Sequence, residues 1–180
     1  MEIVSLADRK EFIAELARLH HAEWKHLNPS LTLEGRAKAI ADAAGQEGIP
    51  SIFIAVSGSQ LVGSAALVRN DMDTKPELSP WLAAVYVKER FRHQGAATSL
   101  IARCEDEAVR SNASTWYLYT EFASKLYEKL GWHRMERSEY RELRSMSCTK
   151  DRFLASWGER AVLEGRTFRQ RSIRDAHERE

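Results

Sequence analysis

One stretch, from Trp81 to Leu100, limits the fold of this chain more than any other. Trp81 to Val87 is apolar apart from the Tyr86 hydroxyl, as is typical of a strand that is covered on both faces. From Ala97 onward, apolar residues recur at helical spacing, at Leu100, Ile101, Cys104 and Ala108. The stretch therefore predicts a buried strand that leads through a short polar turn into an amphipathic helix.

The turn between these two elements contains the pattern Arg92-x-x-Gly95-x-Ala97. Where a strand feeds a helix through such a turn, the first backbone N–H groups of the helix lack a partner and attract phosphate. Gly95 and the small Ala97 let a ligand approach the main chain closely. Taken alone, the pattern fits an ordinary strand-to-helix turn equally well, so a phosphate site is expected only because both flanking elements are predicted.

Length and charge exclude several classes of protein. The 180 residues, 43% of them hydrophobic, suffice for one domain with a sizeable core and a short appendage. The formal net charge of +1 gives no electrostatic reason to expect nucleic acid or an anionic membrane as a partner. No apolar run reaches the roughly 18 residues of a membrane span, and the N-terminal segment does not resemble a secretory signal. A cytoplasmic protein is expected.

The cysteines and histidines do not predict a metal site. Cys104 and Cys148 lie in apolar contexts far apart in the sequence, and we expect buried, reduced thiols. His20 and His21 are adjacent and so point in different directions, which favours solvent or a cleft over a shared metal. No Cys/His spacing fits zinc.

Before the central stretch, the pattern predicts a strand, two helices and a hairpin. Residues 1–6 alternate like a short strand. Asp8 is expected to cap a helix from about Arg9 to Leu27, whose apolar spacing breaks only at Glu23. The remaining predictions here are a second helix at 33–44 capped by Thr32, hairpin strands at 52–56 and 61–68, and a polar loop at 69–80.

After the central helix, the pattern predicts a strand at Thr115–Thr120 and a short helix stopped by Gly131. A last strand pair is expected at 132–136 and 140–150. Antiparallel strands before the central helix and mixed elements after it favour an α/β (α+β) domain with a mixed sheet. Because G-x-G-x-x-G is absent, a dinucleotide-binding Rossmann fold is disfavoured.

Residues 151–180 differ in composition from the rest. They are highly charged with scattered apolar side chains, which predicts one or two amphipathic helices outside a domain of residues 1–150. Three arrangements stay open: packing on the domain, pairing in a homodimer, or a frayed end.

Three blocks of this chain, in order, resemble the GNAT superfamily of acyl-CoA-dependent N-acyltransferases. LAAVYVKERFRHQGAA resembles the strand and Q/R-x-x-G-x-G/A turn of that family, and TWYLYT resembles its next strand. The segment from Ala123 to Trp132, A-x-x-LYEKLGW, is similar to the A-x-x-L-Y-E-K-L-G-F segment of the family and is the most specific match. The resemblance covers about residues 1 to 150 and implies a mixed, mostly antiparallel sheet flanked by helices.

The resemblance implies a binding mode for acetyl-CoA, as co-substrate, between two splayed central strands. The pantetheine arm would pair with the first of these strands near Val85 and Val87, where a main-chain N–H would polarise the thioester carbonyl. Thr120 stands where many members have an asparagine near the cofactor. The pyrophosphate would lie on the turn made by His93, Gln94, Gly95, Ala96, Ala97 and Thr98, which Arg92 opens and braces.

Tyr127 matches the tyrosine that protonates the departing thiolate in the family. Thiols titrate near 8.5 and tyrosine near 10, so full transfer is uphill by about 1.5 pKa units, roughly 2 kcal/mol. A hydrogen bond to the developing thiolate would supply much of the benefit without full transfer. Judged by helical spacing alone, Tyr127 is better explained as a core aromatic, and it is the resemblance that favours the acid role.

The base that deprotonates the amine stays open among Glu121, Asp71, Asp73, Glu77 and water. The three loop acids weakly favour a cationic acceptor. Trp24 and Trp81 are candidates for lining the acceptor pocket, although tryptophan is more often part of a core.

The function implied by the resemblance is transfer of an acetyl group from acetyl-CoA to a primary amine, by direct attack in a ternary complex. The acceptor would be a small molecule or a peptide, and no metal is required. One alternative is an acyl-CoA-binding regulatory domain without catalysis. The other is a cysteine acyltransferase, which has no His/Asp arrangement beside either cysteine in its favour.

Overall fold

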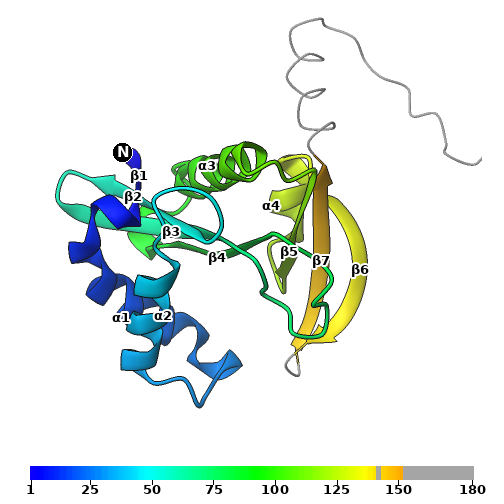
Figure 1. Cartoon of the computed structure of the whole chain (residues 1–180), viewed down its shortest axis with the longest axis horizontal. Helices are drawn as coiled ribbons and strands as arrows, with labels where there is room; N and C mark the ends of the chain where they lie inside the picture. The colour runs from blue at the N-terminus through cyan, green and yellow to red at the C-terminus, as the bar shows by residue number, and fades with distance from the viewer. Residues whose placement is uncertain (141–142, 152–180) are drawn as a thin grey trace, which may run out of the picture.

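A mixed sheet of seven strands organises the computed structural model, which describes residues 1–140 and 143–151 (Figure 1). Across the sheet the strands run in the order β1-β2-β3-β4-β5-β7-β6, and within the described residues every neighbouring pair is antiparallel except β4 and β5. This confirms the predicted fold class. The strands are β1 (Glu2–Ser5), β2 (Ser51–Ser57), β3 (Gln60–Val68), β4 (Trp81–Val87), β5 (Thr115–Thr120), β6 (His133–Tyr140) and β7 (Leu143–Asp151).

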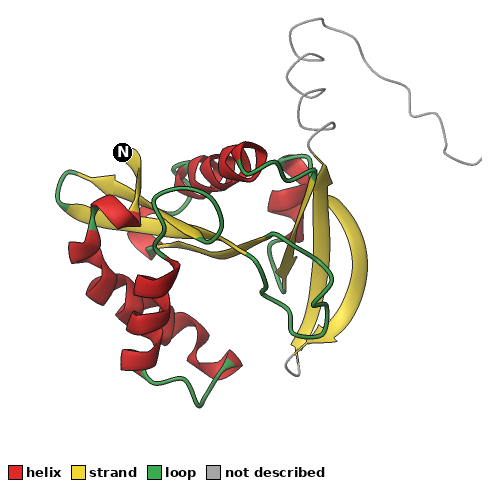
Figure 2. Ribbon diagram, viewed as in Figure 1, coloured by secondary structure: helices red, strands yellow, loops and turns green. Residues whose placement is uncertain are grey.

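Helices cover both faces of the sheet, as Figure 2 shows. Helices α1 (Ile13–Trp24) and α2 (Leu33–Ala43) pack on one face of β2 and β3, and α3 (Ala96–Arg110) and α4 (Ser124–Lys129) lie on the opposite face. Short 3₁₀ turns occupy Leu6–Asp8, Lys10–Phe12, Lys25–Leu27 and Glu89–Phe91.

Each face has its own core, as the alternation of side chains along a strand requires. The helical stripe predicted for α3 is buried at Leu100, Ile101, Cys104 and Ala108, against β-strand residues that include Phe53 and Leu118. On the other face, Leu16 and Ala17 of α1 pack on Ile52 and Ile54. Strand β4 therefore runs between two packed layers, which explains its apolar sequence.

Four predicted details are wrong. Asp8 does not cap the first long helix; it lies in a 3₁₀ turn that the Ser5 hydroxyl caps by accepting from the Ala7 N–H at 3.2 Å. That helix is α-helical only over Ile13–Trp24, with 3₁₀ turns at both ends. Tyr140 belongs to the first strand of the last pair, not to the second. His20 is 3% exposed, so it faces neither solvent nor a cleft.

Other predictions are confirmed or lie outside the described residues. Thr32 caps α2, since its hydroxyl accepts from the Gly35 N–H at 3.0 Å. Among the described residues, no helix is long and apolar enough to cross a membrane. The predicted helices at 152–180 fall outside the part of the chain that the structure describes.

Candidate active site

Strands β4 and β5 separate immediately after they meet. Their register contains a single pair, Trp81 with Tyr117, beside which the Tyr117 N–H donates to the Pro80 carbonyl at 2.9 Å. From Leu82 onward the edge of β4 that faces β5 is not closed by that strand. The splayed central strand pair is thereby confirmed, and a cavity of about 360 Å³ opens beside it.

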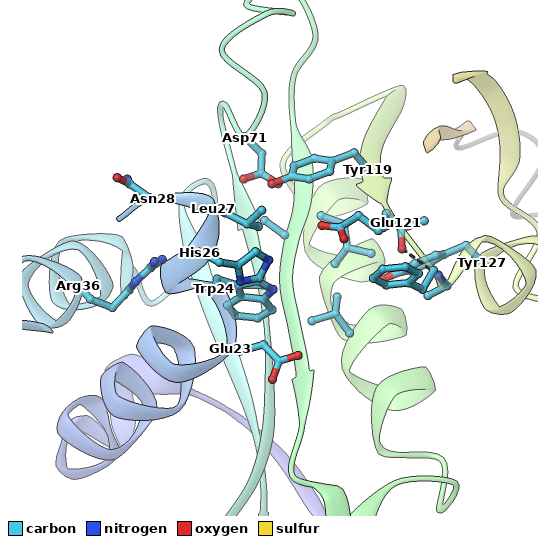
Figure 3. Close-up of a pocket in the computed structure, with 17 residues that line it drawn as sticks. Glu23, Trp24, His26, Leu27, Asn28, Arg36, Asp71, Tyr119, Glu121 and Tyr127 are labelled. Atoms are coloured by element: carbon cyan, nitrogen blue, oxygen red, sulfur yellow. Dashed lines mark hydrogen bonds between the residues drawn. The ribbon is translucent and has the colours of Figure 1, made fainter. Parts of the chain in front are cut away.

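The cavity collects residues that are far apart in the sequence (Figure 3). One side comes from α1, the segment after it and α2. The other side comes from the end of β5 and from α4, and β4 forms the floor between them. The lining residues are Glu23, Trp24, His26, Leu27, Asn28, Arg36, Asp71, Leu82, Ala83, Ala84, Val85, Tyr119, Thr120, Glu121, Phe122, Ala123 and Tyr127.

Three carboxylates, Glu23, Asp71 and Glu121, line this cavity together with the Arg36 guanidinium and the His26 imidazole. In Figure 3, Glu23 lies on the α1 side and Glu121 on the side of Tyr127. The carboxylates and guanidinium of the lining carry a negative formal charge together, since there are three carboxylates and one guanidinium. The cavity therefore attracts cations.

Some predicted acceptor-site residues line this cavity and others do not. Trp24, Asp71 and Glu121 do. The described lining does not include Asp73, Glu77 or Trp81. The Trp81 side chain is fully buried and packs against Tyr117 with the ring centroids 5.8 Å apart, so its predicted place in the pocket is wrong.

The sequence interpretation missed Glu23 as a site residue. Its only signal was a charge that interrupts the apolar spacing of the first long helix. An interruption of that kind marks the point where the helix surface changes from the core to a cavity. It also missed Phe122, which lines the cavity while 92% exposed and so stands at its rim.

Tyr127 lies on α4 and is 7% exposed, with its ring packed edge-on against Trp132 at 5.9 Å between centroids. It lines the cavity, so it is at once a core aromatic and a cavity residue. Burial raises the pKa of the Tyr127 phenol well above its ordinary 10, and Cys148 and Cys104 add to that effect. Its hydroxyl therefore stays protonated and can donate a hydrogen bond.

Thr120 ends β5 beside Tyr127. Its hydroxyl oxygen accepts from the Ala123 N–H at 3.1 Å and so fixes the turn into α4. The hydroxyl hydrogen is not used in that bond, so the same group can still donate to a ligand in the cavity.

The turn before α3 has the backbone shape of an anion site. His93 and Gly95 both have positive φ angles, 61° and 83°, and Gly95 precedes the first residue of the helix. The Ser99 N–H donates to the Gly95 carbonyl at 3.0 Å. The N–H groups of the helix that precede Ser99 come before this bond, so they have no carbonyl partner within the helix. A Cβ placed on Gly95 would meet nothing within 4 Å, so the turn is open on that side.

The polar side chains of this turn serve the turn itself. The Arg92 Nε donates to the Val87 carbonyl at 3.1 Å, and the Gln94 amide donates to the Arg90 carbonyl at 3.1 Å. The brace expected of Arg92 is therefore present. Open space, exposed N–H groups and a helix N-terminus suit a phosphate, so the residues here fit the pyrophosphate of acetyl-CoA.

The two cysteines are free and buried, as predicted. Burial raises the pKa of both thiols, so both stay protonated at neutral pH. The described residues hold no group of three or more His, Cys, Asp or Glu side chains able to bind a metal ion.

Comparison with known proteins supports one class. The chain is similar to an aminoglycoside 6'-N-acetyltransferase solved with coenzyme A (TM-score 0.67, 18% identity, 84% of this chain and 97% of that chain). It is also similar to a ribosomal-protein-alanine N-acetyltransferase from Brucella melitensis (0.63, 17%, 84% and 99%). A third structure, yncA from Salmonella typhimurium with its cofactor acetyl-CoA, scores 0.58 at 14% identity and covers 79% of this chain and 89% of that chain. No curated protein sequence matches.

These likenesses, at under a fifth identity, establish the fold, which is that of acetyl-CoA-dependent acetyltransferases. A family model matches part of the sequence independently of the fold. Residues 49–134 match the family model described as an acetyltransferase (GNAT) domain. This match and the fold together identify a GNAT acetyltransferase domain in the chain.

Proposed function

We propose that this protein transfers the acetyl group of acetyl-CoA to a primary amine by direct attack within a ternary complex. The observation that carries the proposal is the composition of one cavity. Ala84 and Val85 of β4 line it together with Tyr127 and the three carboxylates. A thioester lying along β4 and an amine drawn in by the carboxylates would meet there without a covalent enzyme intermediate.

Acetyl-CoA would bind along two main-chain surfaces. The turn from His93 to Thr98 would hold the pyrophosphate, as the positive φ angles and the α3 N-terminus support. The pantetheine arm would pair with the edge of β4 that faces the gap, at Val85 and Val87, where the Val87 carbonyl also accepts from Arg92. Thr120 would donate its unused hydroxyl hydrogen across the gap.

In the chemical step, the amine nitrogen attacks the carbonyl carbon of the thioester. The C–N bond forms, the C–S bond breaks, and the amine proton leaves to water. A main-chain N–H of β4 stabilises the negative charge on the carbonyl oxygen. Tyr127 donates a hydrogen bond to the departing thiolate, and the raised pKa of this buried phenol favours that role over complete proton transfer.

The acceptor would carry at least one positive charge besides its reacting amine. Three carboxylates against one guanidinium support this, because an ammonium in the cavity would be held by charge. A carboxylate is about six pKa units less basic than an alkylamine. Water is a weaker base still, so the ammonium loses its first proton to bulk solvent before it attacks, and the second proton leaves once C–N bond formation has made the nitrogen acidic. Glu23, Asp71 and Glu121 would serve to attract the acceptor.

A route through a cysteine acyl-enzyme is disfavoured. Cys104 is 1% exposed and Cys148 is fully buried, and the raised pKa of each thiol opposes formation of a thiolate. Neither cysteine is among the described residues that line the cavity.

Residues 1–150 would form the acetyltransferase domain by themselves, with 151–180 as an extension. β7 ends at Asp151, whose carboxylate accepts from the Thr115 hydroxyl at 2.5 Å, so all seven described strands of the sheet lie within residues 1–151. Removal of residues 152–180 should therefore leave acetyl transfer unchanged. Sedimentation of the full and shortened chains would show whether the extension pairs two subunits.

The test is calorimetric titration with acetyl-CoA, followed by release of free thiol with a panel of amines. The panel pairs each diamine with a monoamine of equal length, and adds an aminoglycoside and an N-terminal alanine peptide. Micromolar binding of acetyl-CoA and faster turnover of the diamines would support the proposal. Binding without turnover of any amine would favour the acyl-CoA-binding regulatory domain, and no binding at millimolar ligand would overturn both.

A further inference from the structure

One extra residue in β4 determines which of its peptide groups face the gap between β4 and β5, where acetyl-CoA is proposed to lie. The Pro80 carbonyl accepts from Tyr117 of β5, whereas the Lys88 N–H donates to Val62 of β3 at 2.9 Å. In a regular strand, peptide groups alternate between the two edges, so residues an even number apart face the same edge. Positions 80 and 88 face opposite edges, so the alternation shifts once between them.

The shift occurs at a β-bulge. Ser64 is opposite Tyr86 and Ala66 is opposite Ala83, so that two residues of β4 lie across from one residue of β3. Ala84, within that bulge, has φ 51°, a conformation rare for a residue other than glycine. Beyond the bulge the peptide groups of Val85 and Val87 face the gap. Without the bulge, the peptide groups of Ala84 and Tyr86 would face the gap instead.

A buried hydrogen-bonded chain holds the bulge. The Ser64 hydroxyl, on β3, donates to the Ala84 carbonyl at 3.2 Å, and the same oxygen lies 2.8 Å from Nε2 of His20 on α1. Because a serine hydroxyl has one hydrogen, His20 Nε2 must be the donor to Ser64. His20 is 3% exposed and Ser64 is fully buried, so water does not compete for these bonds.

The rings around His20 fix its direction. Trp24 packs edge-on against it at 4.8 Å between ring centroids, and Tyr86 lies at 6.2 Å, also edge-on. Trp24 itself lines the cavity, so the chain of bonds begins directly behind the acceptor wall. The imidazole has little freedom to turn away from Ser64.

We propose that His20 and Ser64 are positioning residues for acetyl transfer. They hold the Ala84 carbonyl toward β3, and so present the Val85 N–H to the thioester carbonyl. The inference rests on the proposed function and adds to it two residues that do not touch acetyl-CoA. A relaxed bulge would turn the Val85 N–H away from the gap while leaving the pyrophosphate turn intact.

Four variants test the proposal. His20→Leu removes the donor at similar size, His20→Gln supplies an amide N–H near the position of Nε2, and Ser64→Ala breaks the chain at its centre. Ser51→Ala is the matched control, because Ser51 is a fully buried serine of β2 whose hydroxyl has no hydrogen-bond partner within the described residues.

The readouts are kcat at saturating substrates, the Kd of coenzyme A, and the infrared C=O stretch of bound, ¹³C-labelled acetyl-CoA. A carbonyl that loses a hydrogen-bond donor absorbs at higher frequency. We expect His20→Leu and Ser64→Ala to lower kcat about tenfold and to raise this frequency, with the Kd of coenzyme A within twofold. His20→Gln should keep kcat and the C=O frequency close to those of the unmodified protein. Ser51→Ala should change neither kcat nor the C=O frequency.

Two results would overturn the proposal. One is a folded Ser64→Ala with the C=O frequency and kcat of the unmodified protein; this decides the matter even if His20→Leu does not fold. The other is His20→Gln as impaired as His20→Leu, which would assign His20 to packing alone. Failure of the unmodified protein to bind acetyl-CoA would instead overturn the proposed function, so the two failures are distinct.

Discussion

Two surfaces beside the β4–β5 gap, called walls below, are built from different chemical groups. The wall formed by β4 and the turn before α3 offers peptide N–H groups, placed by positive φ angles at Ala84, His93 and Gly95. The opposite wall, at the end of β5 and on α4, offers side chains, of which Tyr127 and Glu121 line the cavity. The first wall would bind the unreactive part of acetyl-CoA and polarise its thioester carbonyl through a peptide N–H, and the second would meet the departing thiolate and the amine.

This difference determines where each wall is vulnerable. A main-chain donor survives most substitutions of its own side chain, and is lost only when the backbone moves. The important residues of the β4 wall therefore lie behind it, as His20 and Ser64 do, or lack a side chain, as Gly95 does. On the side-chain wall, in contrast, removal of a single oxygen should remove a function.

Tyr127→Phe should give the largest effect. Loss of the hydroxyl removes the donor to the departing thiolate, and we expect kcat to fall about 100-fold. The Kd of coenzyme A should stay within twofold, since the β4 wall is unchanged. Stopped-flow measurement of thiol release separates the chemical step from product release.

Tyr117→Phe is the matched control for this prediction. Tyr117 is a half-buried tyrosine of β5 that lies outside the described cavity lining, and its variant should keep full activity. An unchanged chemical rate in Tyr127→Phe would show that the side-chain wall does not assist the leaving group.

Acid should weaken the support of the β4 wall. Burial, together with the charge of Arg36, lowers the pKa of His20 from 6.5 to about 3. Between those values the unfolded chain binds a proton that the folded chain excludes, so stability falls as pH falls. From pH 7 to pH 5, His20 should cost about 2 kcal/mol of unfolding free energy.

This contribution of His20 to the unfolding free energy is measured by urea denaturation at pH 7 and pH 5. The proteins compared are the unmodified protein, His20→Gln and His133→Gln. His20→Gln should lose the part of the pH dependence due to His20, whereas His133→Gln, an exposed site on β6, should keep it. Equal pH dependence in all three would mean that the imidazole takes up its proton without leaving Ser64.

Gly95→Ala should separate binding from stability on the β4 wall. An alanine at φ 83° costs about 1 kcal/mol, and its Cβ would project into the open space where the pyrophosphate is proposed to lie. We expect the Kd of coenzyme A to rise about tenfold. Gly58→Ala, at φ 58° in the turn between β2 and β3, is the control, since its Cβ also meets nothing within 4 Å.

Both glycine variants should lose similar stability in urea, and only Gly95→Ala should lose affinity in calorimetry. Equal affinities for coenzyme A would place the pyrophosphate elsewhere, and would remove the role proposed for the turn.

The sequence predicted those parts of the two walls that depend on short-range patterns. The apolar run of β4 and the helical spacing of α3 are local, and a glycine at position 95 is itself a signal for a positive φ angle. The fold class followed from these elements and their order.

The rest depends on contacts that no local pattern contains. Ala84 has nothing in its residue type that predicts φ 51°, and the His20–Ser64 bond joins positions 44 apart in sequence. The loop before β4 brings Asp71 to the cavity lining, which does not extend to Asp73 or Glu77 within the described residues. That choice depends on how the whole loop folds over Trp81.

Glu121→Gln should give the smallest effect, and it defines what the carboxylates of the side-chain wall do. Glu121 is half-buried, so neutralising it removes a screened attraction. We expect KM for a diamine to rise about threefold, with kcat within twofold and with a smaller change for a monoamine of equal length. Glu77→Gln, in the loop outside the described cavity lining, should change neither constant.

A fall in kcat above 30-fold at unchanged KM, with a lost acidic limb in the pH profile, would instead make Glu121 the base. The side-chain wall would then supply the base as well as the hydrogen bond to the departing thiolate.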